Sequence, residues 1–349
     1  MSELAGVDTP AAVVEVSHLE RNLSRWQEFC DGIGLANRPH VKTHKSVEIA
    51  RRQLELGAAG ITCQKLGEAE TMIDAGIDDV LIAYNILGES KLARLSALLE
   101  RASVSVLADD IDLLAGYARA AGGAGRELGV FADCDTGLGR TGVQTPEEAV
   151  DLAQAIAGHD GLRFDGFLTY PAPPDALGFL AAAVEQAAAR GLSARVVSAG
   201  GTPAMWDAAR LQPTVTEYRV GTYAFHDRAT VAAGAAGLED VALTVHATVV
   251  SRHDGRAILD AGSKALSSDL SSEPGYGLIL EAPLSTIVKL NEEHAYVQLA
   301  PGEQLELGQV VRVVPNHACV VSNLFDEFVV ADAGEIVATW PVDARGLSQ

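Results

Sequence analysis

Short apolar runs typical of β-strands alternate along the first two thirds of the chain with longer amphipathic runs typical of α-helices. The predicted strands lie near residues 38–42, 59–63, 79–84, 103–107, 129–133, 163–168, 195–199 and 215–220. The predicted helices between them lie near residues 45–56, 66–75, 89–101, 109–121, 145–157, 174–190 and 203–209. About eight strand–helix units in roughly 200 residues predict a (β/α)₈ barrel, with a doubly wound open sheet as the competing architecture.

Several of these helices carry recognisable start and stop signals. Gly57 and Gly76 each follow a predicted helix, where glycine commonly ends helical structure. Residues 145–148, TPEE, match an N-cap residue followed by proline and an acidic first turn. These signals support the predicted positions of the helices.

After about residue 235 the pattern changes to strands joined by turns, with few helical segments. The predicted strands lie at residues 241–251, 257–260, 285–290, 294–299, 310–314 and 327–330. We therefore predict a barrel domain over residues 8–236 and a β domain over residues 237–349. The early residues 1–16, which include the apolar run 11–16, are a candidate addition to the β domain.

The chain of 349 residues is strongly acidic, with a formal net charge of −21. This charge argues against a nucleic acid partner and against binding to an anionic membrane surface. We see neither a secretory signal nor an apolar run long enough to span a bilayer. The 4 cysteines are widely scattered and do not suggest a disulfide framework. We therefore expect a cytoplasmic protein.

The segment 38–45, RPHVKTHK, is the strongest candidate for chemistry. Lys42 ends a short apolar run, with His40 and His44 two residues away on either side. If this run is a strand, the three side chains point the same way, because side chains alternate with a period of two. A lysine among groups that can become cationic loses its proton more readily, and the neutral amine can attack an aldehyde. An exposed basic turn is the alternative interpretation.

Small residues follow the last two predicted barrel strands. Gly200, Gly201 and Thr202 come after the seventh, and Gly221 and Thr222 come after the eighth. Small residues let backbone N–H groups approach an anion, and these two loops form the recurring phosphate site of (β/α)₈ barrels. The two loops together predict a phosphorylated ligand, with ordinary turn glycines as the alternative.

Two arginines near strand ends, Arg140 and Arg219, could each place a fixed cation beside a ring substituent. The alternative is an ion pair with Asp133, Asp135 or Glu217. A reactive lysine, a phosphate site and polar strand ends together suggest pyridoxal 5′-phosphate. This cofactor needs an amine that captures its aldehyde, a phosphate site and control of its ring nitrogen.

A second candidate site lies in the predicted β domain, in the segment 315–323, PNHACVVSN. His317 and Cys319 are two residues apart, so in an extended backbone they face the same side. Imidazole and thiolate suit Zn²⁺. With only two protein ligands evident, positions remain for water or substrate, as in a catalytic site. A buried cysteine beside a hydrogen-bonded histidine is the alternative.

Taken together, these motifs resemble the metal-activated, pyridoxal-phosphate-dependent D-serine dehydratase / D-threonine aldolase family, which has an alanine-racemase-like fold. The resemblance runs nearly from end to end, and the first and last of its motifs are the most specific. The motifs are RPHVKTHK (38–45), GITCQKLGEAE (60–70), DCDTGLGRTGV (133–143), SAGGTP (198–203), TEYRVGTYAFHDR (216–228), LDAGSKALSSD (259–269) and PNHACVVSN (315–323).

The resemblance implies a role for each matching residue. Lys42 would bind pyridoxal 5′-phosphate covalently, and His317 and Cys319 would bind a divalent metal. Arg140 and Tyr170 would lie beside the cofactor ring. Arg219 would lie at the ring nitrogen of the cofactor. The loops on the phosphate side would contain Gly200, Gly201, Thr202, Gly221 and Thr222.

Cysteine at the second metal position resembles the D-serine and D-threo-3-hydroxyaspartate dehydratase branch, whereas aspartate is typical of D-threonine aldolases. The resemblance therefore implies a lyase of D-β-hydroxy-α-amino acids that releases a 2-oxo acid and ammonia. A D-threonine aldolase giving glycine and an aldehyde is the alternative. A racemase, which would need a second acid/base such as one near Tyr276, and a non-catalytic cofactor carrier fit less well.

The same resemblance sets the remaining expectations. Zn²⁺ is the expected metal, with Mn²⁺ or Mg²⁺ as alternatives. The expected partner is a small D-amino acid substrate. Related folds pair their two domains across a dimer, so we expect a homodimer.

Overall fold

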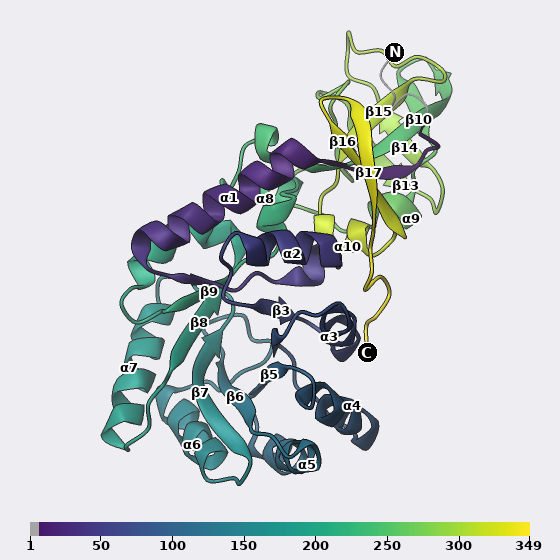
Figure 1. Cartoon of the computed structure of the whole chain (residues 1–349). Coiled ribbons are helices and arrows are strands. Elements are labelled where there is room, and N and C mark those ends of the chain that lie inside the picture. The colour runs from purple at the N-terminus through teal and green to yellow at the C-terminus, as the bar shows by residue number, and fades with distance from the viewer. Residues whose placement is uncertain (1–6) are drawn as a thin grey trace. The chain divides into compact units, whose positions relative to one another are not determined.

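The computed structural model describes residues 7–349, which group into two compact units (Figure 1). The barrel unit comprises Gln27–Lys42, Ile49–Gly221 and Leu347–Gln349. The sheet unit comprises the described part of Met1–Trp26 with Thr43–Glu48 and Thr222–Gly346. The domain boundary between residues 236 and 237 stays a prediction.

Eight parallel strands form the sheet of the barrel unit, in the order β2-β9-β8-β7-β6-β5-β4-β3. They are β2 (Ala36–Asn37), β3 (Ile61–Cys63), β4 (Asp79–Ile82), β5 (Ser103–Ala108), β6 (Leu128–Cys134), β7 (Leu162–Thr169), β8 (Val196–Gly200) and β9 (Glu217–Arg219). A parallel bridge between His40 and Thr62 joins the two ends of this order, so the sheet closes on itself. The order confirms the (β/α)₈ barrel, since an open doubly wound sheet would reverse its strand order.

Helices follow the barrel strands along the chain and lie outside them (Figure 1). They are α2 (Val47–Glu55), α3 (Leu66–Asp74), α4 (Glu89–Leu99), α5 (Leu114–Ala124), α6 (Pro146–Ala157) and α7 (Ala176–Ala189), with 3₁₀ segments η3 (Ile111–Leu113) and η4 (Thr202–Leu211). The helix predicted near residues 203–209 is present as the 3₁₀ segment η4. Ala204 leaves helical geometry there, which interrupts a continuous α-helical ladder.

The predicted helix signals are confirmed. Thr145 Oγ1 accepts a hydrogen bond from Glu148 N at 3.1 Å, and Glu148 Oε2 accepts one from Thr145 N at 3.2 Å. This reciprocal capping box begins α6, with Pro146 in its first turn. Gly57 and Gly76 follow α2 and α3 with φ angles of 114° and 89°, values that favour glycine.

A mostly antiparallel sheet forms the core of the sheet unit, with the main order β13-β14-β11-β10-β1-β16-β17. Its strands are β1 (Ala11–Glu15), β10 (Leu243–His253), β11 (Arg256–Leu259), β12 (Leu278–Ile279), β13 (Thr286–Leu290), β14 (Ala295–Gln298), β15 (Val310–Val314), β16 (Glu327–Asp332) and β17 (Glu335–Pro341). The early strand β1 pairs antiparallel with β10 and parallel with β16. The short β12 and the edge strand β17 are absent from the sequence-based expectation.

Short helical segments complete the sheet unit. They are η5 (Thr222–Ala224), α8 (Arg228–Ala232), η6 (Leu238–Asp240), α9 (Ser263–Leu266) and α10 (Ala318–Ser322), while α1 (Val16–Ile33) contains residues of both units. Across residues 7–349, none of the helices combines the length and the apolar character that crossing a membrane requires.

Candidate active site

Lys42 lies in a 3₁₀ turn, η2 (Val41–Thr43), directly after the bridge at His40. The strand expected over residues 38–42 therefore ends at His40, before Lys42, and the shared face expected for His40, Lys42 and His44 is wrong. A helical turn replaces the two-residue alternation, and the Lys42 backbone N–H donates to His40 Nδ1 with 3.5 Å between the nitrogens. The His44 ring packs edge-on against Phe225 within the sheet unit, with 6.4 Å between ring centres.

The side chain of Gln64 connects Lys42 with His40 inside the barrel unit. Gln64 Oε1 accepts a hydrogen bond from Lys42 Nζ at 3.4 Å and lies 3.2 Å from His40 Nε2. Burial, followed by the positive charges of Lys42 and Arg219, holds the pKa of His40 well below its usual range. The amine of Lys42 therefore has a neutral histidine and a neutral amide as neighbours.

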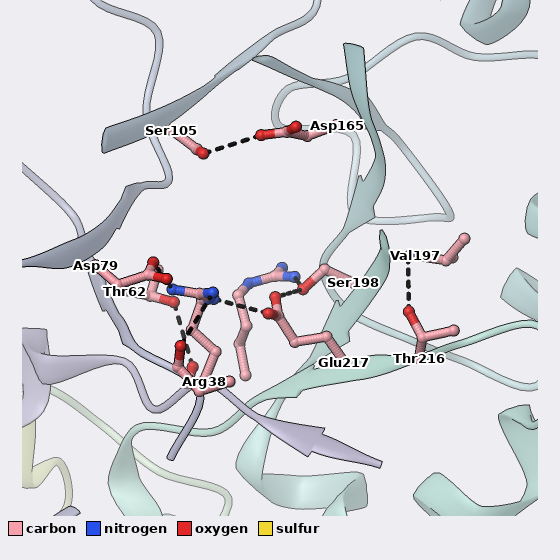
Figure 2. Close-up of polar contacts among 11 residues, drawn as sticks. Arg38, Thr62, Asp79, Ser105, Asp165, Val197, Ser198, Thr216 and Glu217 are labelled. Carbon is pink, nitrogen blue, oxygen red and sulfur yellow. Dashed lines mark hydrogen bonds and ion pairs between the residues drawn. The ribbon is translucent and has the colours of Figure 1, made fainter. Parts of the chain in front are cut away.

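Arg219 is buried at the end of β9, where it donates to Ser198 Oγ and, at 2.8 Å, to the Thr169 carbonyl. Ser198 Oγ donates in turn to Glu217 at 2.7 Å. Glu217 also accepts from Arg38 at 2.7 Å, as Figure 2 shows. Burial lowers the pKa of Arg219 to about 10 although Glu217 and Asp133 oppose the shift. Arg219 is thus a fixed cation that reaches a barrel carboxylate through Ser198.

Arg140 and Tyr170 come together at the ends of β6 and β7. The Arg140 guanidinium lies 5.3 Å from the centre of the Tyr170 ring, within cation–π range. Tyr170 also limits the space beside Gly201, where an added Cβ would come within 3.3 Å of the ring. The Asp135 carboxylate accepts hydrogen bonds from backbone N–H groups at residues 137–139, so it closes its own glycine-rich loop.

Within the predicted phosphate loops of the barrel unit, several groups bond to one another. Gly221 N donates to Thr202 Oγ1 at 3.3 Å, and Gly201 N donates to the Arg219 carbonyl at 3.0 Å. Gly200 lies so close to Arg219 that an added Cβ would sit 2.5 Å from its carbonyl oxygen. Thr222 belongs to the sheet unit, where it begins η5. Whether these loops hold phosphate stays a prediction.

The candidate metal ligands lie at the start of a short helix in the sheet unit. His317 is the N-cap residue of α10 and Cys319 lies in its first turn, so the extended backbone expected for this segment is wrong. The two side chains nevertheless interact: a hydrogen bond with Cys319, aided by Asp269, raises the pKa of His317 to about 9. The Cys319 sulfur lies 3.2 Å from Thr43 Oγ1 and 3.7 Å from Thr222 Oγ1.

Two carboxylates that sequence analysis did not single out support this pair. Asp269 Oδ2 lies 2.7 Å from His317 Nδ1, and Asp227 Oδ2 accepts from Ala318 N at 3.0 Å. A carboxylate on one ring nitrogen orients a histidine so that the other nitrogen can bind a metal. Both aspartates fall inside motifs quoted above (259–269 and 216–228), which is the signal that could have identified them.

These donors fit a divalent metal ion as a two-ligand site. Imidazole and thiolate are suitable ligands for zinc, and water or substrate would complete the coordination. The described residues contain no group of three or more His, Cys, Asp and Glu side chains arranged to hold a metal ion. Three groups of the barrel unit have the chemistry that a phosphorylated aldehyde cofactor needs. They are the Lys42 amine for the aldehyde, and the Arg219 cation and the Thr202 hydroxyl as polar partners.

The fold and the candidate site define an alanine-racemase-like barrel protein with an additional sheet unit. Residues 14–229 match the family described as alanine racemase, N-terminal domain, and residues 242–331 match a putative serine dehydratase domain. An alanine racemase structure from Clostridium difficile 630, at 13% identity and a TM-score of 0.73, shares the fold.

Closer relatives identify the family. The chain is 36% identical to D-threonine aldolase of an Arthrobacter species, covering 99% of this chain and 95% of the relative. It is 34% identical to D-threo-3-hydroxyaspartate dehydratase of Delftia sp. HT23, covering 97% of each. The crystal structure of D-threonine aldolase from Filomicrobium marinum matches with a TM-score of 0.90 at 33% identity, over 99% of this chain and 98% of that one.

The chain therefore belongs to the alanine-racemase-like enzyme family that contains D-threonine aldolases and D-threo-3-hydroxyaspartate dehydratases. The relatives carry the names of lyases, and this chain is an enzyme of that family. Two solved structures of D-threo-3-hydroxyaspartate dehydratase are of variants, one with a cysteine replaced by alanine in a metal-free form and one with a histidine two positions earlier replaced by alanine. The family membership predicted from the motifs is confirmed.

Proposed function

We propose that this chain is a lyase that depends on pyridoxal 5′-phosphate and a divalent metal, and that it dehydrates D-serine or D-threo-3-hydroxyaspartate to a 2-oxo acid and ammonia. The observation that carries the proposal is the His317–Cys319 pair, with Asp269 placed on the histidine ring. The same histidine–cysteine spacing separates the two positions replaced in the dehydratase structures, one of which is metal-free. D-Serine dehydratase of Dictyostelium discoideum, 26% identical, is a more distant relative.

The cofactor would be held by Lys42 through its Nζ, by Arg140, Tyr170 and Arg219 around its ring, and by the phosphate-side loops. Those loops contribute Gly200, Gly201, Thr202, Gly221 and Thr222. When bound, pyridoxal 5′-phosphate supplies a conjugated ring that accepts the electron pair of a broken bond at the substrate Cα. Arg219 is already fixed by Ser198 and Thr169, so binding would not need to order its guanidinium.

Proton transfer falls to Lys42. As a free amine, the Lys42 Nζ would take the α-proton of the substrate. His317 and Cys319 would hold the metal, which supplies Lewis acidity to the β-hydroxyl. Within the sheet unit, Thr43 Oγ1 lies 3.2 Å from the Cys319 sulfur.

Zn²⁺ is the metal we infer, because imidazole and thiolate are its common ligands, with Mn²⁺ and Mg²⁺ as alternatives. The homodimer and the cytoplasmic location stay predictions.

The test is an assay with D-serine, D-threonine and D-threo-3-hydroxyaspartate on metal-depleted and zinc-restored protein. The proposal expects a yellow protein that gives a 2-oxo acid and ammonia only after zinc is restored. Lys42→Ala should lose both the chromophore and turnover. A protein that stays colourless with added cofactor, or a Lys42→Ala variant that stays yellow and active, would refute the proposal.

An aldolase is the second candidate, favoured by the 36% identity to a D-threonine aldolase. The same residues would act, with the metal aiding loss of the β-hydroxyl proton before the Cα–Cβ bond breaks. Glycine and acetaldehyde from D-threonine, with no oxo acid from any substrate, would establish this outcome. Turnover of any substrate would exclude a cofactor carrier.

A further inference from the structure

Gln64, the first residue after β3, holds a position that the proposed function does not use. Its amide nitrogen Nε2 donates to the Ala83 carbonyl at 2.9 Å, at the end of the neighbouring strand β4. Its backbone N–H donates to Glu68 Oε2 at 2.6 Å, in the first turn of α3. The end of β4 therefore holds the amide of this side chain, and α3 holds the backbone of the same residue.

These contacts determine which way the amide faces. A backbone carbonyl can only accept a hydrogen bond, so the Gln64 NH₂ group must point toward Ala83. The Oε1 atom then faces Lys42 Nζ at 3.4 Å and His40 Nε2 at 3.2 Å. Because Oε1 can only accept, His40 must carry its proton on Nε2, which leaves Nδ1 as the acceptor that faces Lys42 N.

The charges around this group make the acceptor important. His40 is neutral in this environment, and the positive charges acting on it are Lys42 and Arg219. The carboxylate of Glu68 is turned to the backbone of Gln64 and Lys65, within 3.3 Å of the latter N–H. A protonated Lys42 therefore donates its hydrogen bond to a neutral acceptor, the Gln64 side-chain oxygen.

We propose that Gln64 is a positioning residue for Lys42: its carbonyl oxygen, oriented by Ala83 and shared with His40, stabilises the ammonium form of the Lys42 side chain. This inference rests on the proposed function for its role in turnover. When the substrate Cα–H bond breaks, the proton forms a new N–H bond at Nζ, and the electron pair left on Cα passes to the cofactor ring. The Gln64 oxygen then accepts a hydrogen bond from the new ammonium and keeps it in place.

The test compares Gln64→Leu, which removes the acceptor, with Gln64→Glu, which makes it anionic. Full-length protein stripped of cofactor is labelled at pH 8 with acetic anhydride, and Lys42 is quantified by mass spectrometry against the exposed Lys289. Only the neutral amine reacts, so Gln64→Leu should label faster and Gln64→Glu slower than wild type. Each rate should change roughly 2- to 10-fold, the range that one net hydrogen bond supports.

A matched control is Gln27→Met. Gln27 is a buried glutamine of the same unit whose amide donates to Asp31 and accepts from Asn37. Its replacement should leave the labelling of Lys42 unchanged. Faster or slower labelling in both Gln64 variants together, or no change in either, would overturn the inference.

A second readout separates a general loosening of the site from the proposed contact. ¹⁵N NMR of His40 should show an Nε2-protonated neutral ring in wild type near pH 7, and a doubly protonated ring in Gln64→Glu, because a carboxylate replaces the amide beside Nε2. An Nδ1-protonated ring in wild type would contradict the hydrogen-bond assignment. Neither readout needs bound cofactor, so failure to bind cofactor would refute the proposed function alone, whereas unchanged labelling in a cofactor-binding protein would refute this inference alone.

Discussion

At the scale of single residues, Arg38 and Glu217 form a buried ion pair. Arg38 Nε donates to Glu217 at 2.7 Å and Arg38 Nη1 donates to Asp79 at 2.6 Å, while the Glu217 side chain is only 4% exposed (Figure 2). A buried charge keeps its partners because removing one leaves the other unpaired in a medium of low polarity. The same carboxylate accepts from Ser198, so it also orients the group that holds Arg219.

Replacing Glu217 with glutamine should therefore destabilise the protein by up to about 3 kcal/mol, because Arg38 loses its buried partner and keeps only the half-exposed Asp79. Urea unfolding followed by circular dichroism measures the loss. Asp207→Asn is the control, because Asp207 and its partner Arg210 are 60% and 79% exposed and such pairs contribute about 0–1 kcal/mol. Equal losses in the two variants would contradict this account of the core.

Asp269 offers a second prediction at this scale. Its carboxylate orients the His317 ring at 2.7 Å, and removing such a group typically weakens metal binding 10- to 100-fold, roughly. Asp269→Asn should weaken zinc binding by that factor in a competition titration with a chromophoric chelator. Asp326→Asn, which removes the partner of Arg345, should bind zinc as wild type does. Undiminished affinity in Asp269→Asn would show that the histidine needs no such support.

Sequence patterns identified some of these residues and not others for a physical reason. Lys42, His317 and Cys319 stand in short motifs whose chemistry is visible locally, although their roles stay predictions. Gln64 and Asp269 gain their meaning from partners 22 and 48 residues away, which only the folded chain brings within hydrogen-bond distance. Local spacing carries no information about such contacts.

At the scale of elements, the alternation of apolar runs predicted all eight barrel strands to within a few residues. It failed at short segments, where side-chain hydrogen bonds and single residues decide the conformation. The turn η2 replaced the end of the strand predicted over residues 38–42, and α10 replaced a predicted extended segment. The edge strand β17 was missed because its exposed and buried positions do not alternate.

Replacing glycine with alanine should have opposite effects on stability at two positions inside these elements. An added Cβ at Gly166 in β7, where φ is 148°, would lie 1.7 Å from the Val196 carbonyl oxygen, whereas Gly178 in α7 has nothing within 4 Å. Gly166→Ala should therefore lower the melting temperature or prevent folding. Gly178→Ala should stabilise the protein by about 0.5–1 kcal/mol, since alanine favours helix. Thermal unfolding of both variants measures this, and equal tolerance of the two would contradict the close approach of β7 and β8.

At the scale of the whole molecule, composition and pattern predicted the class of fold, and the two compact units interleave along the chain. Residues Thr43–Glu48 belong to the sheet unit although they follow the first barrel strand, and Leu347–Gln349 belong to the barrel unit although they end the chain. Leu347 packs against Gly67, and Gly67 N donates to the Gln349 carbonyl at 3.0 Å. Such exchanges depend on long-range contacts, which local sequence patterns do not reveal.

Stability of the whole chain should fall in mild acid, because two buried histidines are held neutral. Burial lowers the pKa of both His226 and His246 to about 4. In the unfolded chain a histidine titrates near 6.5, so between about pH 6.5 and 4 the unfolded state binds more protons and stability is lost as pH falls. Each histidine would account for about 3 kcal/mol of that loss.

The strand β10 carries both the test residue and its control. His246 is buried in its first half and His253 is exposed at its end. The difference in unfolding free energy between wild type and His246→Gln should shrink by up to about 1.4 kcal/mol for each pH unit lowered below 6.5, because the variant has no proton to take up there. His253→Gln, which replaces the exposed histidine of the same strand, is the control. Denaturant unfolding at pH 7, 6 and 5 measures both, and parallel pH profiles for all three proteins would show that His246 is not the group that makes the fold sensitive to acid.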